Sequence, residues 1–183
     1  MAGRVRNPER MRATLLDAGL RVAERSALGW LTLDQVVAEA RVAKGSLLHH
    51  FGDRAGYLRA LHRRFHDRLL ADIARACAGL PAGRKRLHRG AATYLDACLR
   101  HRGVRALLLE ARAEPGIAAE VVARNTEIAR RVEPDLTALG WPDVKESARL
   151  WVAMVAEAAL VEFAAQRRRP GVRRALMRFL GAA

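Results

Sequence analysis

Several features are scarce in this sequence of 183 residues, and each scarcity excludes a class of protein. No stretch without Asp, Glu, Lys or Arg is longer than eight residues, whereas a membrane-spanning helix needs about 20 mostly apolar residues. The two cysteines, Cys77 and Cys98, are too few for a disulfide framework, which favours the reducing cytoplasm. No apolar run follows the basic N-terminus, so a secretory signal is not expected. The apolar content of 51% excludes a disordered chain.

Positive charge is abundant, but it says little by itself about partners. The 33 basic residues outnumber the 19 acidic ones and give a formal net charge of +14. Of these, 30 are Arg and 3 are Lys, and Ala makes up 36 residues, a bias that genome composition also produces. Residues 1–70 and 71–183 are both basic, so total charge does not show which part meets a polyanion.

The pattern of apolar residues predicts helices throughout and no β-strand. Val, Ile and Thr do not alternate with polar residues over any useful length, and Pro and Gly interrupt the helical periodicity at a few points. The fold class is therefore all-α, with about nine helices. The segments are predicted at about 8–27, 33–40, 44–51, 54–78, 84–102, 104–113, 117–139, 143–168 and 172–181.

A helix-turn-helix unit is predicted near the N-terminus. Thr32 and Gln35 have the spacing of a capping box at the start of a short helix. A tight turn over residues 41–43 leads into a second short helix, 44–51, and a longer helix precedes both. In segment 44–51, Leu47 and Phe51 are four residues apart and form the packed side.

Residues 29–58, GWLTLDQVVAEARVAKGSLLHHFGDRAGYL, resemble the DNA-binding domain of TetR-family transcriptional regulators. With the preceding amphipathic helix, the resemblance covers about the first 60 residues, and the rest matches the family only in being helical and of suitable length. The matching positions run without a gap: Gly29, Thr32, Val36, Ala38, Ala40, Val42, Gly45, Ser46, Leu47, His49, His50, Phe51, Arg54 and Leu58.

The resemblance implies a helix-turn-helix DNA-binding domain over residues 1–53 and a helical ligand-binding and dimerisation domain over 54–183. It also implies a homodimer on palindromic double-stranded operator DNA, acting as a repressor that a small-molecule inducer releases, with no enzymatic activity and no cofactor. Segment 44–51 would enter the major groove, where small or polar side chains read base edges. The residues expected in the groove are Lys44, Ser46, Leu48, His49 and His50, and those expected on or near the DNA backbone are Arg4, Arg6, Thr32 and Arg41.

Three positions depart from the family pattern. Arg41 stands where the turn usually carries Gly, although its charge adds attraction for DNA. Ala43 stands where Ser or Thr usually caps the recognition helix, and loss of a cap costs ~1 kcal/mol. Leu48 stands where an aromatic residue, usually Tyr, reaches the DNA backbone. These changes bear on operator affinity more than on the fold.

The stretch from Leu150 to Phe163 predicts a subunit interface. Its only charges are Glu157 and Glu162, and its apolar residues surround the helix, so a monomer of this size would leave part of it uncovered. We expect dimerisation through residues 143–181, as the resemblance implies. Glu157 is expected to be buried, either paired with an Arg or recognising a cationic ligand.

Two further sets of residues have alternative interpretations. Helical spacing permits a ligand pocket or plain core at Tyr94, Cys98, Leu107, Val121, Trp151, Met154 and Glu157. The basic residues around 84–89 and 100–105, which include Arg105, are expected on a solvated face, with an acidic-ligand entrance or a second DNA contact as alternatives.

A rival function is a helical metal-binding protein or an enzyme that uses His62 and His66. These residues are four apart on a predicted helix, a spacing that can hold a metal ion. No third ligand is recognisable nearby, and the sequence HRRFHDR is too basic to attract a cation. A solvated or phosphate-facing helix is favoured, and neither a metal site nor a catalytic residue is predicted.

Overall fold

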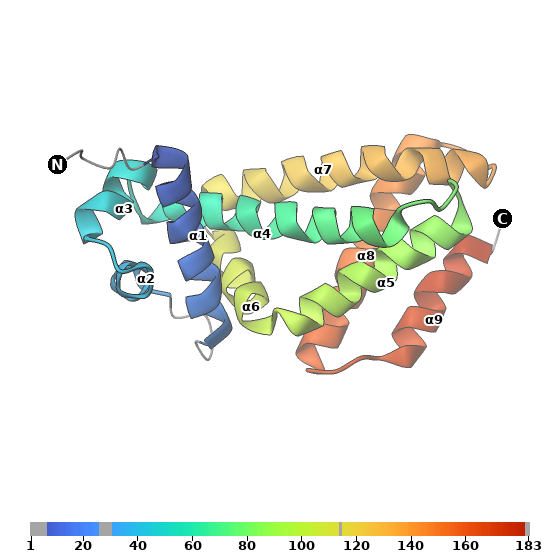
Figure 1. Ribbon diagram of the computed structural model, residues 1–183. Helices are drawn as coiled ribbons and strands as arrows, with labels where there is room; N and C mark the ends of the chain where they lie inside the picture. Colours follow the sequence, from blue (N-terminus) through green and yellow to red (C-terminus); the bar gives the residue numbers. More distant parts are fainter. Residues whose placement is uncertain (1–6, 26–30, 114, 182–183) are drawn as a thin grey trace. The chain divides into compact units, whose positions relative to one another are not determined.

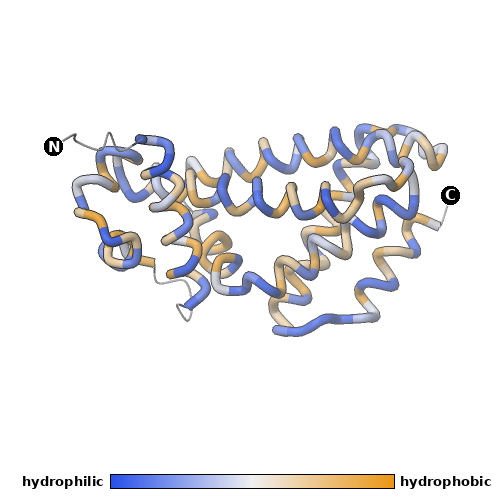
Figure 2. Tube along the Cα trace, viewed as in Figure 1, coloured by the Kyte–Doolittle hydropathy of each residue, from blue (hydrophilic) through white to orange (hydrophobic). Residues whose placement is uncertain are grey.

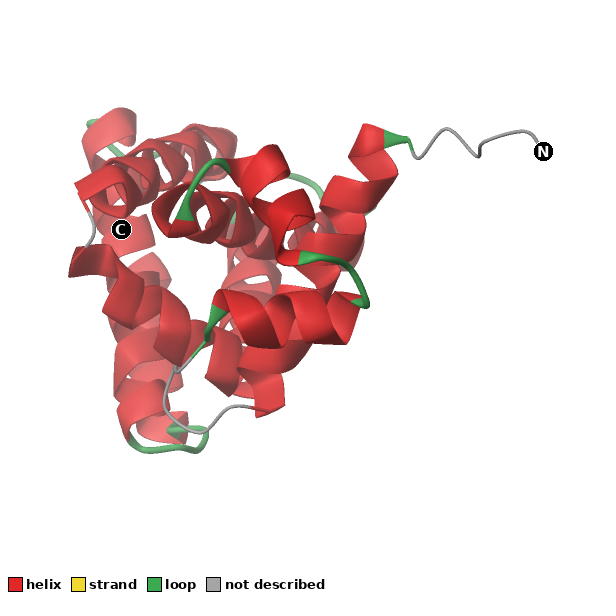
Figure 3. Cartoon of the chain, turned by 90° about the vertical axis from the view of Figure 1, so that its left-hand side faces the viewer, coloured by secondary structure: helices red, strands yellow, loops and turns green. Residues whose placement is uncertain are grey.

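The computed structural model describes residues 7–25, 31–113 and 115–181, and all regular elements in these ranges are helices (Figures 1 and 3). The all-α prediction is confirmed, and the predicted segments agree with the observed helices to within a few residues at their ends. The described α-helices are α1 (Pro8–Arg25), α2 (Leu33–Ala40), α3 (Lys44–Phe51), α4 (Arg54–Cys77), α5 (Arg84–Arg100), α6 (Arg102–Glu110), α7 (Pro115–Ala138), α8 (Val144–Ala164) and α9 (Pro170–Arg178), with short 3-10 turns at η2 (Ala111–Ala113) and η3 (Phe179–Gly181).

The helices form two compact units. The first unit comprises Met1–Asp67 and Gly103–Ala118, and the second comprises Arg68–Arg102 and Ala119–Ala183. Helices α4 and α7 each contribute residues to both units. The expected domain boundary after residue 53 stays a prediction, because contacts between helices do not establish where an independently folding domain ends.

In the first unit, α1 packs against α2 and α3, and Tyr57 near the start of α4 contacts α1. The buried Tyr57 hydroxyl donates a hydrogen bond to the Leu15 carbonyl oxygen at 3.0 Å. Burial raises the pKa of Tyr57, so this donor keeps its proton. Gly19 makes the approach possible, because a Cβ atom at this position would lie 1.9 Å from the Tyr57 oxygen.

In the second unit, α8 packs against α5 and α9 around an apolar core. Its largest members include Leu95, Trp151 and Leu176, one from each helix. Figure 2 shows hydrophobic and hydrophilic residues alternating along the helices in the pattern of amphipathic elements. No helix in the described part of the chain is both long and apolar enough to cross a membrane.

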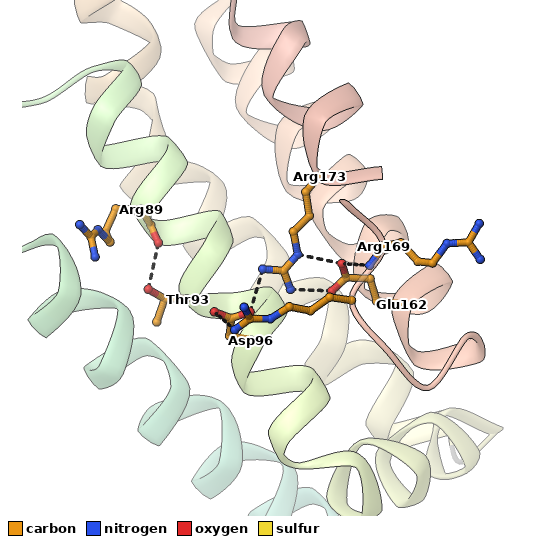
Figure 4. A network of polar contacts seen from close by, with 7 residues as sticks. Arg89, Thr93, Asp96, Glu162, Arg169 and Arg173 are labelled. Carbon is orange, nitrogen blue, oxygen red and sulfur yellow. Dashed lines mark hydrogen bonds and ion pairs between the residues drawn. The ribbon is translucent and has the colours of Figure 1, made fainter. Parts of the chain in front are cut away.

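An ionic network around the buried Glu162 connects α5, α8 and α9 in the second unit (Figure 4). Glu162 is 0% exposed, and its carboxylate accepts hydrogen bonds from Arg173 Nε at 2.7 Å, from Arg173 Nη2 at 2.6 Å and from the Arg169 backbone N–H at 2.8 Å. Arg173 Nη1 also donates to Asp96 at 2.7 Å. Burial alone would raise the pKa of Glu162, but the hydrogen bonds from Arg173 and Arg169 outweigh it and lower that pKa.

The network corrects the expectation about the acids of this helix. Glu157 is exposed on α8, and the buried carboxylate belongs to Glu162 five residues later. The buried side of α8 carries Trp151, Val155, Ala158 and Glu162, a helical spacing that leaves Glu157 off the stripe. An uncompensated carboxylate would be costly at such a site, and Arg173 supplies the compensation.

The solvated face expected for the basic segments is also partly wrong. Arg86 forms an ion pair with Asp135 at 2.6 Å and is only partly exposed. Arg105 is buried, with 3% of its surface exposed. The helix carrying the histidine pair is not fully solvated either, because His62 is buried in the first unit.

Candidate nucleic-acid interface

Helix α2 begins with the capping box expected from the sequence. The Thr32 side chain accepts a hydrogen bond from the Gln35 backbone N–H at 3.2 Å, and the Gln35 side chain accepts one from the Thr32 N–H at 2.9 Å. Two N–H groups that the helix leaves unpaired are thereby satisfied. The start of α2 is fixed, which in turn fixes where the turn toward α3 begins.

The turn between α2 and α3 depends on one left-handed residue. Arg41 has φ 56° and ψ 48°, and its N–H donates to the Ala38 carbonyl at 3.2 Å. The Val42 N–H closes the turn on the Val37 carbonyl at 3.0 Å. The family's usual Gly adopts this conformation without strain, whereas a residue with a Cβ atom pays about 1 kcal/mol for it. Arg41 keeps the turn geometry, and its side chain is exposed.

Helix α3 has a buried side and an exposed side, as predicted. Leu47 and Phe51 are buried, and Leu48 is 40% exposed. Helix α1 holds this helix in place, because the Arg12 guanidinium lies 4.4 Å above the Phe51 ring and donates a hydrogen bond to the His50 carbonyl oxygen. Sequence reasoning missed Arg12, since nothing in its spacing identifies a partner 38 residues away.

The N-terminus of α3 lacks a side-chain cap, as expected for Ala43. Lys44, the next residue, forms an exposed ion pair with Asp34 of α2, with Nζ and Oδ1 2.8 Å apart. Such surface pairs are worth ~0.2–1 kcal/mol, so this contact can be exchanged for a phosphate. A Cβ atom at Gly45 would meet nothing within 4 Å, which leaves open space beside the backbone of this first turn.

Ion pairs between α1 and α2 stiffen the unit behind this surface. Arg21 Nε lies 2.7 Å from the Glu39 carboxylate, and Arg25 pairs with the same carboxylate. The hydrogen bond from Arg21, followed by that from Arg25, lowers the pKa of Glu39. The acid therefore stays ionised between two cations, and α1 and α2 keep their packing.

The structure places most of the expected DNA-contacting residues on three adjacent stretches, α2, the turn and α3. Thr32, Arg41, Lys44, Leu48 and His49 are exposed, and Ser46 and His50 are partly exposed. Arg4 and Arg6 lie outside the described residues. The contacts of all these residues with DNA stay predictions.

The expected ligand-pocket residues are distributed over both units. Cys98 and Trp151 are in the core cluster of the second unit, and Tyr94 and Met154 pack against it. Leu107 is buried in the first unit, while Val121 is half-buried and Glu157 exposed in the second. Their role in ligand binding stays a prediction.

The histidine pair lies on α4 with ring centroids 4.3 Å apart. Among the described residues, no group of three His, Cys, Asp or Glu side chains is arranged to hold a metal ion. His62 and His66 thus lack a third ligand in the described part of the chain, which does not favour the rival function.

Comparison with known proteins favours a transcriptional regulator that binds DNA. The sequence profile for "Bacterial regulatory proteins, tetR family" matches residues 15–61. The HTH-type transcriptional regulator BetI of Burkholderia mallei is 36% identical over 86 residues, 46% of this chain and 44% of that protein. BetI of Burkholderia thailandensis is 37% identical over the same length. The chain therefore spans less than half the length of the curated relatives it matches.

Solved structures share the fold over nearly the whole chain. A transcriptional regulator from Rhodococcus sp. Rha1 has a TM-score of 0.74 and 24% identity, covering 96% of this chain and 94% of that one. The multidrug binding protein EbrR, crystallised with imidazole, has a TM-score of 0.70 and 26% identity, covering 95% of this chain and 91% of that one. The similarity thus extends beyond the helix-turn-helix.

Proposed function

Because this chain belongs to the TetR family of transcriptional regulators, we propose that it binds operator DNA sequence-specifically as a homodimer and represses transcription until a small molecule releases it. The observation that carries this proposal is α3, whose apolar side is buried while Leu48 and His49 face solvent after a tight turn. This is the form of a recognition helix that enters the major groove. A protein of this kind acts in the cytoplasm, beside the chromosome, and no enzymatic step is proposed.

Two symmetric recognition helices require a two-fold operator with half-sites about one DNA turn apart, roughly 34–36 Å. Selection of bound duplexes from a random pool should therefore yield a palindrome. Binding to it should weaken steeply with salt, because contacts from Lys and Arg release counterions from DNA. Enrichment of a single asymmetric site, or of no sequence, would contradict the proposal.

The contribution of α3 is tested by placing an acid on its exposed side. We expect His49→Glu to weaken operator binding by ~5- to 150-fold, because a carboxylate in the groove repels phosphate and loses the base contact. Asn125→Glu is the matched control, since Asn125 is also exposed but lies on α7 in the second unit. Fluorescence anisotropy with both variants measures the difference, and equal losses would place the DNA elsewhere.

Leu48→Tyr tests which part of DNA this position meets. If Leu48 faces the DNA backbone, the Tyr hydroxyl should gain a phosphate hydrogen bond worth ~0.5–1.5 kcal/mol on operator and unrelated duplex alike. The salt slope should hardly change, because Tyr adds no charge. Titration of both duplexes at two salt concentrations checks this; a loss confined to the operator would mean that Leu48 packs on a thymine methyl.

The homodimer is proposed to form through α8 and α9. Leu150 is 66% exposed on α8 and Phe179 is 53% exposed at the end of α9, whereas large apolar side chains are ordinarily buried. Ala153 is exposed beside Leu150 one turn along α8. An apolar surface of this kind on a soluble helix is typical of a subunit interface.

The inducer is proposed to bind in the helical part of the chain beyond α3. EbrR, which shares the fold over nearly the whole chain, is described as a multidrug binding protein and was solved with imidazole bound. Such a ligand changes DNA affinity only if it binds the DNA-competent and DNA-incompetent states with different affinity.

A further inference from the structure

Arg105, on α6 in the first unit, is a buried cation to which the described residues offer no counter-charge. It is 3% exposed, and its Nε and Nη2 atoms have no hydrogen-bond acceptor. No ion pair to Arg105 occurs among the side chains that the structure describes. Arg173 shows the contrast, because that partly buried guanidinium is met by two carboxylates, Glu162 and Asp96.

Loss of a proton does not relieve the cost of burying an arginine, since a guanidinium stays charged at all physiological pH values. A charge withdrawn from water without hydrogen bonds or a counter-ion strongly destabilises a folded protein. A buried guanidinium therefore implies an acceptor, and a planar fork of N–H donors matches the geometry of a carboxylate or phosphate.

The neighbours of Arg105 on α6 indicate the chemical character of the rest of such a ligand. Val104, Leu107 and Leu108 are all buried, with exposed fractions of 1%, 2% and 3%. A ligand that reaches Arg105 therefore meets mostly apolar side chains, which match the hydrocarbon part of an organic acid but not an inorganic anion. We propose that Arg105 anchors the anionic group of the effector, and that the effector is an otherwise apolar organic acid.

The position of Arg105 gives such a ligand a direct route to the DNA-binding helices of the same unit. Two residues earlier, Gly103 lies so close to the end of α1 that a Cβ atom on it would be 2.1 Å from the Ala23 carbonyl oxygen. A shift of α6 when the acid binds must therefore move α1 or break this contact. Helix α1 in turn packs on α2 and α3. This coupling rests on the proposed function, whereas binding of the acid at Arg105 does not.

The first experiment measures thermal stability without ligand. Arg105→Met replaces the unpartnered charge by an apolar side chain of similar length, and its Tm should rise by at least ~2 °C. Arg102→Met is the matched control, because Arg102 is exposed on the same helix, and its Tm should stay within ~1 °C of the wild type.

The second experiment measures binding by calorimetry on the full chain, with straight-chain carboxylates of six to twelve carbons as probes. Octanoate should bind the wild type and Arg102→Met with the same affinity, and it should bind Arg105→Met at least ~10-fold more weakly. Octanamide, which carries no charge, should not compete with octanoate for the wild type. Operator binding, measured separately with and without octanoate, reports the coupling alone. If octanoate does not change the operator affinity of the wild type, the binding site at Arg105 stands but its coupling to DNA binding is contradicted.

The proposal is overturned if Arg105→Met is no more stable than the wild type, if this variant retains octanoate binding, or if octanamide binds as tightly as the acid. Failure of every carboxylate of this series to bind the wild type overturns the assignment of an apolar acid. Inorganic phosphate binding with the same affinity as octanoate would do so too, since the apolar neighbours would then contribute nothing.

Discussion

Leu150→Arg is expected to convert the protein into a monomer and to weaken operator binding by at least ~100-fold. An interface that buries this side chain would also bury the new guanidinium without a counter-ion, a change that costs several kcal/mol per subunit. A monomer presents one recognition helix instead of two and loses half of its DNA contacts together with the linkage between them. Sedimentation and anisotropy measure the two effects on the same samples.

Val122→Arg is the matched control for this substitution. Val122 and Leu150 are both 66% exposed, but Val122 lies on α7 and outside the expected interface. Its substitution should leave the dimer intact. A Leu150→Arg chain that sediments as a dimer would place the interface elsewhere. Ala159 is unsuitable for the same test, because it is 1% exposed in the chain's own core and a charge there would disrupt folding.

Removal of the buried carboxylate should produce the largest loss of stability. Glu162→Ala is expected to lower the free energy of unfolding by ~3–5 kcal/mol, because it leaves Arg173 partly buried with only Asp96 as counter-ion. Glu157→Ala, on the exposed side of the same helix, should change it by less than ~0.5 kcal/mol. Urea denaturation compares the two variants, and equal losses would contradict the assignment of Glu162 as the buried acid of α8.

The same network predicts how stability depends on pH. Because the folded pKa of Glu162 lies below its ordinary value of 4.5, the stabilisation is complete above that pH and is lost as the pH falls through the lowered pKa. Glu162→Gln cannot ionise, so its unfolding free energy should depend less steeply on pH below about 4.5 than that of the wild type. Parallel curves for the two chains would contradict this prediction.

The helix-turn-helix could be predicted from the sequence because its signals are local. The capping box at Thr32 and Gln35, the buried pair Leu47 and Phe51, and the missing cap at Ala43 all lie within a few residues of their partners. The left-handed conformation of Arg41 was not predicted, although Arg41 stands where this turn usually carries Gly. Such signals between residues close in sequence can be recognised without knowledge of the tertiary contacts.

What the sequence could not predict depends on contacts between distant segments. The stretch 150–163 is apolar on all sides, so its pattern did not show that Glu162 faces the chain's own core while Glu157 faces outward. Arg105 was expected on a solvated face, the default for a cluster of basic residues. Its burial follows from how α6 packs, and no periodicity in the sequence distinguishes it from its exposed neighbour Arg102.

The ion pair between Lys44 and Asp34 affects how such a dimer would search a genome. If Lys44 contacts a phosphate as proposed, it must first leave the Asp34 carboxylate, so Asp34 would compete with DNA for this lysine. At ~0.2–1 kcal/mol per pair, two pairs in such a dimer would weaken binding to random DNA by a factor of about 2 to 30. The same loss occurs at the operator, but base contacts still hold the protein there, whereas random sites offer little besides phosphate. Less of the protein is then held by the millions of competing sites, and more of it is free to find its target.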